Sequence, residues 1–149
     1  MTAVKFEYLM TNFKQTPNWQ PISMLPVIAN LIDGGIVDTE QQLATLLEAE
    51  GKPYAFDDYT VQRVVKVYTE QKEFLSIYTL QLDKWKLSNP SASQKQEIDR
   101  LEKQLVKFRE LNTKVLDLAE KLEGQTIETL LAKSDEEIGL ETLLSKLRY

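Results

Sequence analysis

The sequence contains neither cysteine nor histidine among its 149 residues. Without cysteine, the chain can form no disulfide framework and can run no thiolate chemistry. Without histidine, Ser-His-Asp and Cys-His catalysis, histidine-ligated zinc and carboxylate-histidine di-iron sites are all excluded. Carboxylates, lysine, tyrosine and serine are the groups left for chemistry. We find no motif that organises them, so we predict no catalytic residue, no cofactor and no metal site.

Glycine and proline are also scarce, with 5 of each in the whole chain. Few helix breakers indicate long, uninterrupted elements, and no stretch alternates apolar and polar residues long enough to predict a strand. Apolar residues make up 42% and charged residues 28%, which is typical of a globular protein. The length fits one ordinary domain. We therefore predict a single all-helical domain over residues 1–149.

Positive charge is in deficit, because 18 basic residues face 23 acidic ones and the formal net charge is -5. A surface that binds duplex nucleic acid normally needs a surplus of lysine and arginine, so nucleic acid is disfavoured as a partner. Docking on anionic lipid is disfavoured for the same reason. The N-terminal residues lack the basic start and apolar core of a signal peptide, and no apolar run approaches the roughly 18 residues that span a bilayer. We expect a cytoplasmic protein with no membrane association.

Two long stretches carry a heptad pattern, in which apolar residues recur in alternating steps of three and four. They occupy about residues 57–87 and 91–123, and the short connection at Asn89 and Pro90 requires them to be antiparallel. The sequence therefore predicts an all-α bundle around a long coiled-coil-like helical hairpin. Its seam consists of Val61, Val64, Tyr68, Gln71, Leu75, Tyr78, Leu82 and Trp85, and of Ile98, Leu101, Leu105, Phe108, Asn112, Val115, Ala119 and Leu122.

The two polar residues of the seam specify its register. If Trp85 lies opposite Ile98 near the hairpin tip, then Gln71 lies opposite Asn112 in the same layer. A single buried polar layer often fixes the register of a coiled coil, at some cost in stability. We predict that Gln71 and Asn112 form such a structural layer.

Short amphipathic helices are predicted before the hairpin. The first covers residues 4–14. A second starts near Pro26 and ends at Gly34 and Gly35, because glycine commonly ends a helix. A third starts at Asp38 or Thr39 and ends before Gly51.

Two further short helices are predicted after the hairpin, one over residues 126–132 and one that Ser134 caps. We expect the N- and C-terminal helices to pack at the base of the hairpin. Asp57 and Asp58 precede the first hairpin helix, where carboxylates cap free N–H groups and complement the helix dipole. Capping explains this acidic pair better than a metal site does.

A second apolar stripe on the first hairpin helix suggests a function. Phe74, Ile77 and Leu80 lie beside the seam, near the hairpin tip. Burying each such side chain contributes on the order of 1.5–3 kcal/mol, so exposed neighbours of this kind often mark an interface. We predict that these three residues contact a protein partner or a second copy, which makes the chain a non-enzymatic protein–protein interaction module.

Two other functions remain open from the sequence. Residues 39–68 could form a degenerate helix-turn-helix, with Arg63 and Lys66 on its second helix, which would make the protein a DNA-associated regulator. Alternatively, the protein is a small-molecule-binding or enzymatic helical bundle without a recognisable motif. The first alternative requires basic residues gathered on one face, and the second requires polar residues that converge in a pocket.

Overall fold

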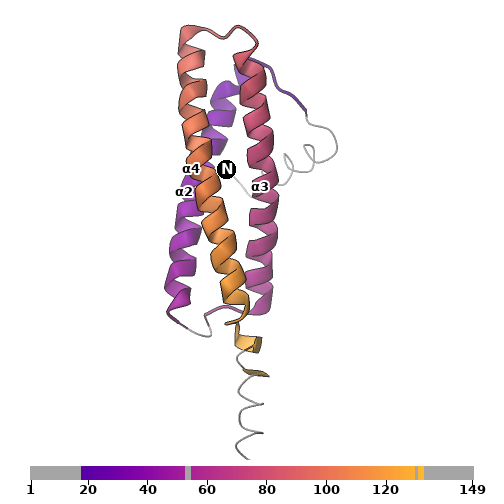
Figure 1. Ribbon diagram of the computed structural model, residues 1–149, viewed down its shortest axis with the longest axis vertical. Helices are drawn as coiled ribbons and strands as arrows, with labels where there is room; N and C mark the ends of the chain where they lie inside the picture. The colour runs from indigo at the N-terminus through magenta and orange to yellow at the C-terminus, as the bar shows by residue number, and fades with distance from the viewer. Residues whose placement is uncertain (1–17, 53–54, 130, 133–149) are drawn as a thin grey trace, which may run out of the picture.

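The computed structural model describes residues 18–52, 55–129 and 131–132. In this part of the chain the 3₁₀ turn η1 (Ile22–Met24) leads into three long helices, α2 (Leu25–Glu50), α3 (Asp58–Lys86) and α4 (Ala92–Glu123). The three helices lie along one long axis, with the α3–α4 connection at one end and the α2–α3 connection at the other (Figure 1). The predicted all-α bundle around a long helical hairpin is therefore confirmed.

The bounds of the hairpin agree with the local signals in the sequence. Asp57 caps α3 by accepting a hydrogen bond from the Thr60 backbone N–H, and this bond lowers the pKa of its carboxyl. Ser91 caps α4 in a complete capping box, since its hydroxyl accepts from the Gln94 backbone and the Gln94 side chain accepts from the Ser91 backbone. Both caps satisfy N–H groups that the first helical turn leaves without partners.

The predicted break at Gly34 and Gly35 is wrong, because α2 continues through both glycines to Glu50. Glycine costs about 1 kcal/mol in a helix interior. Burying Ile32 and Ile36 against the hairpin offsets this cost at about 1.5–3 kcal/mol each. Gly35 also makes room for a neighbour, since a Cβ atom built there would lie 2.5 Å from Cζ of Phe108.

Helix α2, which joins the predicted second and third helices, therefore does not sit only at the base of the hairpin, as predicted, but runs along its length (Figure 1). Helix α4 packs closely against both α3 and α2, whereas the backbones of α2 and α3 make few close approaches of their own. Every seam residue of the predicted heptads is buried except Val64, which is half-buried. Helix α4 is thus the central element of the bundle.

Among the described residues the apolar core forms two clusters. The cluster toward the hairpin tip includes Ile32 of α2, Leu82 of α3 and Leu101 of α4. The cluster toward the base includes Leu46 of α2 and Val115 of α4. The polar layer separates them.

The segment after α4 closes the base. Thr126 donates a hydrogen bond to the Asp58 carboxylate at 2.5 Å, and the Glu128 carboxylate accepts one from the Asp58 backbone N–H at 3.0 Å. Helical turns follow at residues 127–129 and 131–132, within the predicted 126–132 helix. The predicted helices over residues 4–14 and from Ser134 onward lie outside the described residues.

Candidate functional site

A buried polar layer crosses the bundle midway along its length. Nε2 of Gln71 donates to Oδ1 of Asn112 at 2.8 Å, and Nδ2 of Asn112 donates to the Tyr68 carbonyl at 3.1 Å. The contact between the two amides confirms the predicted register in this layer. Nε2 of Gln71 also reaches Oγ1 of Thr39 at 3.2 Å, and Thr39 donates to the Gly35 carbonyl at 2.7 Å.

Thr39 is the member of the layer that sequence reasoning missed. It was expected to start a helix, but it is fully buried in the middle of α2. Because Thr39 lies on α2, its hydrogen bond with Gln71 connects α2 to the polar layer that α3 and α4 share. The phenol of Tyr68 lies beside it, where burial raises the pKa of Tyr68 to about 12 against the opposing effect of a hydrogen bond with Thr39.

The four side chains of this layer therefore bind one another or the backbone. A ligand-binding site needs polar groups that remain available in a cavity. Here the amides and the hydroxyl of Thr39 already have partners within the fold, so the layer acts as a structural element.

The predicted interface stripe divides into buried and exposed residues. Phe74 is only 2% exposed and belongs to the apolar cluster near the tip, packed edge-to-face on Tyr78. The prediction of Phe74 as an interface residue is therefore wrong, because the fold itself already buries this ring. Ile77 is half-buried against the same cluster, and Leu80 is 51% exposed. Contact of Ile77 and Leu80 with a partner stays a prediction.

A shallow groove of about 800 Å³ lies between the first turns of α2 and α4. Leu25 and Ala29 belong to its apolar lining, and Asp33, Glu97 and Arg100 supply charge. The Arg100 guanidinium donates to both carboxylate oxygens of Asp33, at 3.0 and 2.9 Å, and these bonds lower the pKa of the Asp33 carboxyl.

Arg100 also contacts Glu97 at 2.6 Å, so the charged groups of the groove are paired with one another. The i, i+3 spacing of Glu97 and Arg100 is visible in the sequence. Asp33, by contrast, lies 67 positions from Arg100, and no local pattern joins them.

The helix-turn-helix alternative loses its structural basis. Residues 39–50 are the end of the long helix α2, and α3 runs in the opposite direction along the same long axis of the bundle (Figure 1). A helix-turn-helix instead crosses its two helices at about 90–120°. Among the described residues, no group of three or more acidic side chains gathers where it could hold a metal ion.

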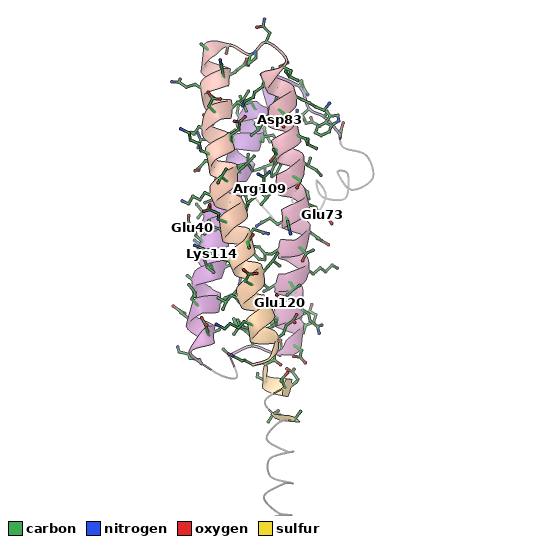
Figure 2. All side chains as sticks on the ribbon, in the orientation of Figure 1. Glu40, Glu73, Asp83, Arg109, Lys114 and Glu120 are labelled. Carbon is green, nitrogen blue, oxygen red and sulfur yellow. The ribbon has the colours of Figure 1, made fainter. Side chains whose placement is uncertain are left out.

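The outward surfaces of the three helices differ in charge. Figure 2 shows charged side chains along the outside of the bundle, among them Glu73 and Asp83 of α3 and Lys114 and Glu120 of α4. The first half of α2 differs, because its exposed residues carry no charge. We call this the outer α2 face: Pro26, Val27, Asn30, Gly34 and Val37.

The outer α2 face belongs to an unusually apolar segment. By length and composition alone, the helical stretch Ile22–Glu50 could cross a membrane, although core helices of soluble proteins meet the same criterion. Only 33% of its most apolar window is buried in the fold. Val27 is 44% exposed and Val37 is 53% exposed. The bundle therefore leaves apolar surface of α2 uncovered.

Comparison with protein-family models, with curated proteins and with solved structures finds no match for this chain. The geometry of the fold alone therefore supports the proposals below.

Proposed function

We propose that this protein is a non-enzymatic protein-interaction module that associates with a second copy of itself through the outer α2 face. One observation carries the proposal: the outer α2 face is exposed, uncharged and partly apolar, whereas the outward surfaces of α3 and α4 carry charged residues. Uncharged apolar surface of this kind is typical of the centre of a protein interface.

The local electrostatics support contact between apolar surfaces. Asp33 is the only charged residue between Leu25 and Val37, and Arg100 of the same chain already neutralises it. A partner that covered the face from Pro26 to Gly34 would therefore bury no unpaired charge, whereas the exposed carboxylate of Asp38 borders the face beside Val37. Burying an unpaired charge is the largest obstacle to such a contact.

Symmetry favours a second copy as the partner. In a two-fold interface the same patch supplies both sides, so the uncharged centre of one copy meets the uncharged centre of the other. Each copy carries a net charge of -5, so the two chains repel at long range. Salt screens such repulsion, and we expect association to become tighter as ionic strength rises.

Light scattering of the full chain tests the proposal. We expect the wild type to be a dimer, and we expect Val27→Glu with Val37→Glu to give a monomer with an unchanged helical circular dichroism spectrum. The matched control is Val106→Glu on α4, because Val106 is 55% exposed but lies among charged residues. That control should remain dimeric.

A wild type that stays monomeric at all concentrations and salt strengths would overturn the proposal. Retention of the dimer in the Val27→Glu, Val37→Glu variant would overturn the assignment of the surface. Co-sedimentation of the wild type, but not of this variant, with zwitterionic lipid vesicles would assign the outer α2 face to a membrane instead.

A further inference from the structure

The first described residues lie beside the C-terminal end of α3, near the hairpin tip. The Gln20 backbone N–H donates to Oε1 of Gln81 at 2.7 Å, and the Gln20 carbonyl accepts from Nε1 of Trp85 at 2.9 Å. Nζ of Lys84 lies 4.8 Å from the centre of the Trp19 ring. These contacts from three side chains of α3 fix the position of Trp19 and Gln20, and therefore the entry point from which the preceding residues extend.

An incompletely covered apolar surface lies next to this entry point. We call it the α2–α3 face and define it by Leu31 of α2 and by Ile77 and Leu80 of α3. Leu31 and Ile77 pack on the apolar cluster near the tip but are only half-buried, and Leu80 is 51% exposed. The backbones of α2 and α3 approach each other little, so neither helix covers the face fully.

The sequence before the entry point suits this surface. Phe6, Leu9, Met10 and Phe13 follow the i, i+3, i+4, i+7 spacing of one helix face. A helix over residues 4–14 would be about 16 Å long, which matches roughly eleven residues of α3 at the same rise. The three residues 15–17 link it to Asn18 and reach at most about 10 Å.

We propose that residues 4–14 of the chain dock as an amphipathic helix on the α2–α3 face of the same chain, as a fourth helix of the bundle. The short link decides between the same chain and another copy. A segment tethered this close to its site has an effective concentration in the millimolar range, which exceeds the concentration of a second copy in solution. The docked helix covers Ile77 and Leu80, and the proposed self-association uses the outer α2 face instead.

Cysteine crosslinking tests the docking cleanly, because the natural chain contains no cysteine. Met10→Cys with Leu80→Cys should crosslink rapidly with a short bismaleimide and give a product of monomer mass. The control pair is Met10→Cys with Val106→Cys, since Val106 is 55% exposed on α4 and Leu80 is 51% exposed. We expect the control to crosslink at least about tenfold more slowly, at a rate set by random encounter.

Two further variants test whether the apolar face of residues 4–14, and not self-association, is responsible for the crosslinking. Adding Leu9→Glu and Phe13→Glu to the first pair should slow its crosslinking at least about tenfold, a loss of about 1.4 kcal/mol of docking free energy. The same reaction in the Val27→Glu, Val37→Glu background should be unchanged, because docking does not depend on self-association.

Equal crosslinking rates for the two cysteine pairs would overturn the proposal. A product only of dimer mass, with a rate that falls on dilution, would show that the segment docks on another copy and would also overturn it. If the Met10→Cys, Leu80→Cys variant gives no intramolecular product while the protein remains a dimer, docking is refuted but the proposed function is not. Formation of the intramolecular product in the Met10→Cys, Leu80→Cys variant, together with a wild type that is monomeric in light scattering, supports docking and refutes self-association.

Discussion

Gln71 of α3 and Asn112 of α4 donate and accept one hydrogen bond, 2.8 Å long, at the boundary between the two apolar clusters of the bundle. Thr39 of α2 completes the contact by accepting a second bond from the same Gln71 amide. A shift of either hairpin helix by one turn would leave these buried groups without partners. The layer therefore specifies which residues of the three helices face one another.

Removing one partner of this layer should destabilise the fold more than removing both. Gln71→Leu leaves Oδ1 of Asn112 buried without its donor, and we expect a loss of about 1–3 kcal/mol in the free energy of unfolding. Gln71→Leu with Asn112→Leu should recover most of this loss. Urea unfolding of the two single variants and the double variant gives the coupling energy. Strictly additive losses would contradict a direct contact.

Gly35→Ala and Gly34→Ala should have opposite effects on stability. At Gly35 the new methyl group would overlap the Phe108 ring, and overpacking of this kind costs about 1–3 kcal/mol. At Gly34 no atom lies within 4 Å of the added Cβ, so the better helix propensity of alanine should stabilise the fold by about 0.5–1 kcal/mol. Thermal unfolding followed by circular dichroism measures both. A stabilised Gly35→Ala variant would show that α2 and α4 pack less closely than described.

Two buried tyrosines should make the fold sensitive to alkali. Burial raises the pKa of Tyr68 to about 12 and raises the pKa of Tyr78 as well. The folded protein thus holds these protons more tightly than the unfolded chain, whose tyrosines titrate near pH ~10. The stability that these raised pKa values contribute to the folded protein is complete below pH ~10, and it is lost as the pH rises through about 12.

The control for this pH dependence is Tyr68→Phe with Tyr78→Phe, which keeps both rings. The wild type should lose stability more steeply than this variant above pH ~10, by up to about 1.4 kcal/mol per pH unit for each phenol. Denaturant midpoints measured across this pH range give the two slopes. Equal slopes would mean that neither phenol is protected from water.

The capping box of α4 should respond to one serine and not to its neighbour. Ser91→Ala removes the side chain that caps the Gln94 backbone N–H, and we expect a loss of about 1 kcal/mol. Ser93 lies within the first turn of α4 and caps nothing. Ser93→Ala should therefore change the free energy of unfolding by less than about 0.5 kcal/mol. Chemical denaturation of the two variants compares them directly, and a larger loss at Ser93 would contradict the assigned cap.

The sequence by itself determined the hairpin, because its signals are local. The caps at Asp57 and Ser91 depend on residues within one helical turn. The heptad pattern identifies nearly all of the buried seam, and the two amides fix its register. Each of these features follows from steps of three or four residues, which a reader of the sequence can count.

Only the tertiary structure decided the path of α2 and the fate of the second apolar stripe. Local rules end a helix at Gly34 and Gly35, but burial of isoleucines against two distant helices outweighs the cost of the glycines. The same distant packing buries Phe74 and brings Thr39 to Gln71, 32 positions away. Contacts between residues so far apart depend on how whole helices pack, and no short-range pattern encodes them.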